Sequence, residues 1–265
     1  MAPLREHHRR AITLLTERFK DDPRFPALIV GGSIVKDRAR DDSDVDVLFI
    51  ATDDEWRKRE ETGDYFFLIS DITDYEGGYV DGKVVNYQFL QDAASHGSEP
   101  ARSAFIGAFT AYSRIPGLDA LIATIPVYPE SERKDKIEAF YSCVLLLSGF
   151  FVREAVKRDD LYLLHKSCAD LVFYGARLVL AHNRIIYPYH KWLMTEVARA
   201  PEKPLGFKEL ADAVLMRPGV ETAKAFGDAL IGWREWGIDW QRAVSRFIED
   251  NEWNWREGRP PLADW

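Results

Sequence analysis

The stretch GGSIVKDRARDDSDVDVLFIA, residues 31–51, decides the fold of this chain. An apolar run at residues 26–30 stops at its two glycines, which indicates a buried strand that meets a tight turn. Residues 44–51 begin with polar and apolar side chains in alternation and then become continuously apolar, which predicts a second strand. Together with an amphipathic helix expected at residues 4–19, the pattern predicts a mixed α/β region.

Two acidic side chains stand at the start of the second predicted strand. Asp44 and Asp46 are two positions apart, so they share one face of the strand and lie a few Å from each other. Like charges that close repel unless cations sit between them. Mg²⁺ and Mn²⁺ prefer oxygen ligands, and a pair of such ions can stabilise both the attacking and the leaving oxygen of a phosphoryl displacement. We therefore predict that Asp44 and Asp46 are metal ligands.

The glycine turn supplies the second half of the predicted site. Backbone N–H groups at Gly31 and Gly32, with the Ser33 hydroxyl, can hold the anionic tail of a nucleoside triphosphate. Lys36 follows one turn later and can add a positive charge, and Ser43 directly precedes the acid pair. We predict that all five residues belong to one nucleotide site.

The segment from Gly31 to Asp46 resembles the signature of polymerase-β-like nucleotidyltransferases, which include aminoglycoside, lincosamide and small antitoxin-type members. The resemblance covers residues 28–50. It implies a mixed sheet with the nucleotide bound over one face. It also implies transfer of a nucleoside monophosphate, AMP in our expectation, from NTP to an acceptor hydroxyl.

The resemblance further implies a third carboxylate on a neighbouring strand. We expect that strand at residues 83–90, joined to residues 78–80 by a hairpin at Asp81-Gly82. The matching position then holds Asn86, whose amide can coordinate a metal but cannot act as a base. We assign Asn86 to the catalytic site as a neutral contact, with Asp81, Glu76 and Asp74 as alternative acids.

A boundary is expected at Pro126–Pro129, which separates a nucleotidyltransferase domain (1–127) from an all-α substrate domain (128–265). The predicted fold class is therefore α+β, a mixed sheet with helices followed by a helical bundle. We expect a helix at 98–114, two long antiparallel helices at 130–158 and 160–183, and shorter helices beyond. Residues 183–193 resemble helical-domain segments of antibiotic nucleotidyltransferases. On that basis Lys191 would reach the triphosphate, and Tyr187 or Tyr189 would contact the acceptor. Packing of these aromatic residues in the core is an equal alternative.

Composition limits the classes of partner. The formal net charge of −8 argues against nucleic acid and suits a small hydroxylated acceptor that is cationic, such as an aminoglycoside. Residues 1–10 do not resemble a signal peptide. The apolar run at 139–152 is too short to span a bilayer and is expected to be a buried helix. We expect a cytoplasmic enzyme without membrane contact. The sequence leaves its oligomeric state open.

The Asn86 position leaves an alternative function open. Without a third acid, the chain could be a nucleotide-binding regulatory or antitoxin-type module with weak or no transfer activity.

Overall fold

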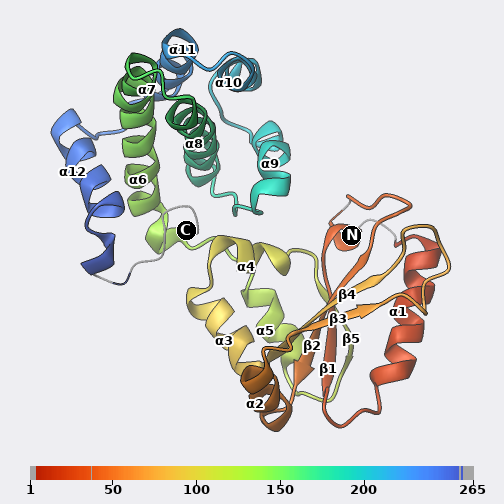
Figure 1. Ribbon diagram of the computed structural model, residues 1–265. Helices are drawn as coiled ribbons and strands as arrows, with labels where there is room; N and C mark the ends of the chain where they lie inside the picture. The colour runs from red at the N-terminus through yellow and green to blue at the C-terminus, as the bar shows by residue number, and fades with distance from the viewer. Residues whose placement is uncertain (1–3, 37, 257, 259–265) are drawn as a thin grey trace. The chain divides into compact units, whose positions relative to one another are not determined.

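The computed structural model describes residues 4–36, 38–256 and 258, and the chain divides into two compact units, Met1–Val127 and Tyr128–Trp265. The first unit contains a mixed β-sheet with helices, whereas the described part of the second contains helices and no strand (Figure 1). The predicted α+β class, a mixed sheet followed by a helical region, is therefore confirmed.

The sheet of the first unit has five strands in the order β3-β4-β2-β1-β5 (Figure 1). β2 and β4 are parallel, and the other neighbouring pairs are antiparallel. The strands are β1 (Ala27–Val30), β2 (Val45–Ala51), β3 (Phe66–Ile69), β4 (Val80–Asn86) and β5 (Phe109–Ser113). The strand that carries Asp46 is thus central, between β1 and β4.

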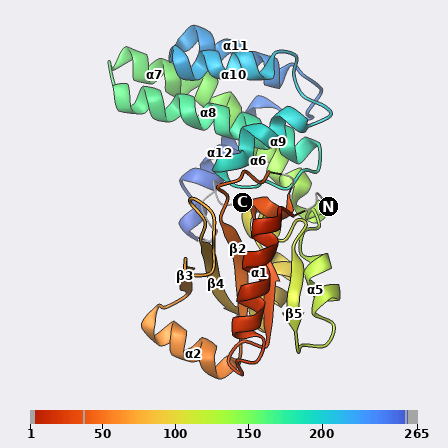
Figure 2. The same ribbon diagram turned by 90° about the vertical axis from the view of Figure 1, so that its right-hand side faces the viewer.

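Helices cover both faces of this sheet (Figures 1 and 2). Val47 and Phe49 of β2 pack in one cluster with Leu15 of α1, whereas Ile50 packs in another with Leu90 of α3. This division follows from the alternation of side chains along a strand. The helices of the unit are α1 (Glu6–Phe19), α2 (Asp53–Thr62), α3 (Tyr87–His96), α4 (Glu99–Ala104) and α5 (Leu118–Thr124).

The expected hairpin at Asp81-Gly82 is wrong, because both residues lie inside the continuous strand β4. Gly82 is required for packing and not for a turn. A side chain there would place its Cβ 2.7 Å from Cε2 of Phe49 and 3.1 Å from Cβ of Phe67. The glycine makes room for an aromatic ring of the neighbouring strand, and a local sequence pattern cannot show such a contact.

The helix expected at residues 98–114 is also corrected. α4 ends at Ala104, and the chain then turns into the edge strand β5. The turn uses Gly107, whose φ of +74° is left-handed and whose Cβ would lie 2.7 Å from the carbonyl oxygen of Val35. The hydroxyl of Tyr112 then donates to the carbonyl oxygens of Phe19 and Phe25, both 3.1 Å away. Pairing with β1 thus overrides a helical pattern.

The second unit is built on two long helical segments that lie side by side (Figure 2). The first is α6 (Arg133–Leu146), which continues through a π-helical turn at Leu147–Phe151 into α7 (Val152–Lys157). The second is α8 (Leu161–His182), whose N-terminus is capped by Asp160, with Oδ1 accepting from the Leu163 N–H at 2.9 Å. The remaining helices are α9 (Leu193–Arg199), α10 (Phe207–Met216), α11 (Val220–Ile231) and α12 (Trp240–Asn251).

One helical segment in the described part of the chain, Glu130–Lys157, is long and apolar enough to cross a membrane by those two criteria. Its most apolar window is 56% buried inside the protein, and Phe140 and Val144 belong to the core of the second unit. Core helices of water-soluble proteins meet the same criteria. The burial agrees with the buried helix expected at residues 139–152.

Candidate metal centre

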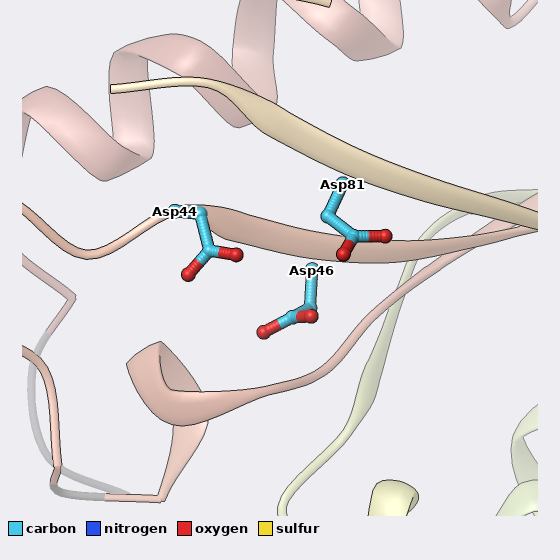
Figure 3. A group of neighbouring side chains, drawn as sticks. All are labelled: Asp44, Asp46 and Asp81. Atoms are coloured by element: carbon cyan, nitrogen blue, oxygen red, sulfur yellow. The ribbon is translucent and has the colours of Figure 1, made fainter. Parts of the chain in front are cut away.

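Three carboxylates converge on one side of the sheet (Figure 3). Asp44 directly precedes β2, Asp46 lies in β2, and Asp81 lies opposite Asp46 in the register of β4. One ligand oxygen from each can be chosen so that all three lie within 4.8 Å of one another. Parallel pairing in this register brings Asp81 to the predicted pair, so three half-buried acids form one cluster.

The electrostatics of the cluster show that negative charge is costly there. Burial raises the pKa of Asp46 above its ordinary value, the charge of Asp44 raises it further, and Asp81 acts in the same direction. The positive charges of Lys83 and Lys36 lower it. Lys83 also donates to Oδ1 of Asp81 at 2.8 Å. Crowded carboxylate oxygens of this kind are the donor set that Mg²⁺ and Mn²⁺ prefer.

The glycine turn lies directly against Asp46. The N–H of Gly31 donates to the carbonyl oxygen of Asp46 at 2.9 Å, which ties the turn to β2. Gly32 has a φ of +74°, and a Cβ on it would lie 1.9 Å from Oδ2 of Asp46. Both the backbone conformation and the close approach therefore require glycine. Ser33 follows at the first position of a short 3₁₀ helix, Ser33–Val35.

Lys36 and Ser43 have structural partners in this unit. The Lys36 ammonium donates to the carbonyl oxygen of Ser103 at 2.6 Å, at the end of α4. The Ser43 hydroxyl accepts from the Arg40 N–H at 2.9 Å, and its carbonyl accepts from the Tyr75 hydroxyl at 2.8 Å. Ser43 thus anchors the loop that presents Asp44, while its role as a nucleotide contact stays a prediction.

Tyr79 was missed by the sequence analysis. The negative charge of Asp44, more than burial, raises the pKa of the Tyr79 hydroxyl above its ordinary value. The carbonyl oxygen of Tyr79 also accepts from the Val45 N–H at 2.9 Å. Tyr79 lies two residues before Asp81. That spacing would have pointed to Tyr79 as a neighbour of the acids only if the pairing of β2 with β4 had been known.

Asn86 does not join the cluster. It pairs with Ala51 at the far end of the β2–β4 ladder, five residues beyond Asp81. Its side chain caps α3, with Oδ1 accepting from the Phe89 N–H at 2.9 Å. The expectation that Asn86 occupies the third position is therefore corrected, because the register gives that place to Asp81. Of the other two alternatives, Asp74 pairs with Arg10 of α1, and Glu76 is exposed.

The capping role of Asn86 leads to a testable prediction. We expect Asn86→Ala to lower the free energy of unfolding by about 1 kcal/mol, as loss of an N-cap does, without weakening Mg²⁺ binding. Urea denaturation and calorimetric Mg²⁺ titration measure the two effects. Asn86→Ser, which can still cap, should restore stability. Weakened Mg²⁺ binding in both variants would contradict the assignment.

The residues predicted in the second unit have different environments. Tyr187 is fully buried, with the Arg177 guanidinium 4.1 Å from its ring centroid, so the expectation that it contacts an acceptor is corrected to a place in the core. Tyr189 is 53% exposed and has a left-handed φ of +73°. Lys191 is exposed in the 3₁₀ turn His190–Trp192, with its ammonium 5.7 Å from the Trp192 ring centroid.

No protein-family model and no curated protein matches this chain. Among solved structures, it is similar to a nucleotidyltransferase-like protein from Exiguobacterium sibiricum 255-15. The alignment covers 94% of this chain and 79% of that protein, with 15% identical residues and a TM-score of 0.49. At that identity and score, the likeness assigns neither a family nor an activity.

Proposed function

We propose that the chain is a nucleotidyltransferase that uses Mg²⁺ or Mn²⁺ to transfer a nucleoside monophosphate, AMP in our expectation, from NTP to a hydroxyl of a small acceptor. The observation that carries this proposal is the convergence of Asp44, Asp46 and Asp81 beside a turn that only glycine can form. The motif at residues 31–46, which contains Gly32, Asp44 and Asp46, resembles that of polymerase-β-like nucleotidyltransferases and supports the same function.

The donor set fits the cations that this chemistry needs. Asp44, Asp46 and Asp81 would hold them, since three crowded carboxylates offer hard oxygen ligands and carry charge that cations would neutralise. Bound there, divalent cations would stabilise the charge that develops on the attacking and leaving oxygens.

The chain's own residues would bind and orient the reactants. Gly32 and Ser33 would hold the phosphates through their backbone N–H groups and the Ser33 hydroxyl, beside the Asp46 carboxylate that lies against Gly32. The acceptor oxygen forms a bond to the α-phosphorus, the bond from that phosphorus to the α–β bridging oxygen breaks, and pyrophosphate leaves. Asp81 would take the proton of the acceptor hydroxyl, a role that an amide at the same place could not perform.

The inactive-module alternative depended on the lack of a third acid. Asp81 removes that argument, so we propose the enzyme alone. Exposed Lys191 and Tyr189 stay our candidates for contacts with bound substrates, in a helical substrate domain at residues 128–265.

The proposal is tested by incubating the protein with Mg²⁺, each α-³²P-labelled NTP in turn and a panel of hydroxylated small molecules. Labelled acceptor and pyrophosphate should form together. Asp44→Asn should reduce both by more than about 100-fold, since even the loss of a residue behind a metal ligand costs 10–100-fold. The matched control is Asp54→Asn, an exposed acid of α2 that pairs with Arg57 and should keep full activity.

Binding gives a second readout that needs no acceptor. Calorimetry should show Mg²⁺-dependent ATP binding in the wild type and in Asp54→Asn. Asp44→Asn should lack this binding. ATP binding that is insensitive both to Mg²⁺ and to the Asp44 substitution would overturn the proposal.

A further inference from the structure

A small cavity opens on the same side of the sheet as the three acids. Its volume is about 380 Å³, at the small end of the range for ligand pockets. Leu48 and Lys83 line it, and each is the next residue on the same strand face after Asp46 and Asp81, respectively. The cavity therefore continues directly from the carboxylate cluster along β2 and β4.

The position of the cavity favours an acceptor as its occupant. Gly32, where the phosphates would lie, is reached from β1 on one side of Asp46. Asp81 and the part of the cavity that Lys83, Val84 and Val85 line belong to β4, on the other side of β2. An in-line displacement needs the attacking oxygen and the leaving pyrophosphate on opposite sides of the α-phosphorus. The side of the cluster toward β4 is therefore the place for the attacking hydroxyl.

The lining defines the chemistry of that acceptor. The walls are mostly aliphatic and aromatic, with Leu48, Val85, Phe89, Ala104 and Phe105 among them. Lys83 is the cationic group of the lining, and its ammonium lies on Asp81 at 2.8 Å. A polycationic acceptor would have to lose the hydration of its ammonium groups against apolar walls, and it would find Asp81 already paired with Lys83. An uncharged aryl or alkyl group meets neither cost.

We propose that this cavity binds the apolar part of a neutral acceptor alcohol and directs its hydroxyl toward Asp81. The inference rests on the proposed function and replaces the cationic acceptor expected from net charge with an apolar one. In the transfer step the alcohol oxygen bonds to the α-phosphorus, pyrophosphate departs, and the hydroxyl proton goes to Asp81.

The first experiment measures binding and not turnover. Ligand-observed NMR compares 3-phenylpropanol, a neutral aryl alcohol, with 1,3-diamino-2-propanol, a hydroxylated dication, in the presence of Mg²⁺ and the non-transferable analogue α,β-methylene ATP. We expect the aryl alcohol to bind together with the analogue and the dication not to bind. Stronger binding of the dication, or competition between the alcohol and the analogue, would overturn the inference.

Variants locate the binding site. Ala104→Trp should fill the cavity and lower the affinity for 3-phenylpropanol at least about tenfold, because burial of an aromatic group contributes a factor of that size or more to the affinity. Ala123→Trp is the matched control, since Ala123 is an exposed alanine in the last turn of α5 and lies outside the cavity lining. Phe89→Ser removes an aromatic wall of the cavity and does not fill it. This variant should also bind 3-phenylpropanol more weakly. Equal affinities in all three variants would refute the assignment.

The two proposals can fail separately. Cavity-dependent binding of the aryl alcohol without transfer from any NTP would refute the proposed function but leave the binding site standing. Transfer to a polycationic acceptor that is unaffected by Ala104→Trp would leave the function standing and refute the apolar acceptor site.

Discussion

Gly32→Ala is expected to abolish Mg²⁺-dependent nucleotide binding and transfer. The new Cβ would lie 1.9 Å from Oδ2, 2.5 Å from Cγ and 2.6 Å from Cβ of Asp46, so the carboxylate must leave its place in the cluster. The φ of +74° adds strain of about 1–2 kcal/mol for a residue with a side chain. We expect Mg²⁺ affinity to fall by more than about 100-fold, as for direct loss of a ligand.

Gly63→Ala is the matched control for this substitution. Gly63 follows α2 with a φ of +70°, nearly the same conformation, but an added Cβ there meets nothing within 4 Å. Both variants should lose stability from backbone strain in urea denaturation. Only Gly32→Ala should lose Mg²⁺ binding in calorimetry. If the two variants bind Mg²⁺ equally well, the close contact between the turn and Asp46 does not control the site.

The half of the site that comes from one local segment could be predicted from the sequence. Two glycines after an apolar run required a turn, and alternation through Asp44, Val45 and Asp46 placed both acids on one face of a strand. Each of these signals depends on neighbours along the chain. The structure places the turn against Asp46 as that pattern requires.

The third acid could not be predicted in the same way because its position depends on pairing between distant segments. Asp81 is brought opposite Asp46 by the parallel register of β2 and β4. The Asp-Gly dipeptide suggested a hairpin, since glycine in a turn and glycine under an aromatic ring look alike in sequence. The ring of Phe49, which requires Gly82, is contributed by the neighbouring strand.

The segment at residues 183–193 shows a second limit. Tyr187 and Tyr189 are two positions apart and equally aromatic, yet one is fully buried and the other is half exposed. The difference arises from Arg177 of α8, which covers the ring of Tyr187, and from the left-handed backbone at Tyr189. Neither cause has a local sequence signal that separates a core tyrosine from a binding one.

Asp46→Asn is expected to abolish transfer and yet to stabilise the metal-free protein. Loss of the central ligand should lower activity by more than about 100-fold. Burial and the charges of Asp44 and Asp81 raise the pKa of Asp46, so in the fold its ionised form is destabilised relative to the unfolded chain. Removal of that charge should raise the thermal midpoint in EDTA at neutral pH. Mg²⁺ should then raise the midpoint of the wild type but not that of the variant.

The stabilisation of the metal-free protein by Asp46→Asn should depend on pH in one direction. Since the folded pKa of Asp46 lies above its ordinary value of 3.8, the folded state binds the proton more tightly than the unfolded state. The destabilisation of the wild type is therefore full above the folded pKa and disappears as the pH falls toward 3.8. The stability advantage of Asp46→Asn over the wild type should vanish in acid.

Asp71→Asn is the control of opposite sign. A hydrogen bond from Arg18 lowers the pKa of Asp71, so removal of the Asp71 carboxylate should not stabilise the protein at neutral pH. Equal midpoints for Asp46→Asn and wild type in EDTA at neutral pH would mean that the cluster is not strained in the absence of cations, and the electrostatic argument for a metal site would then fail.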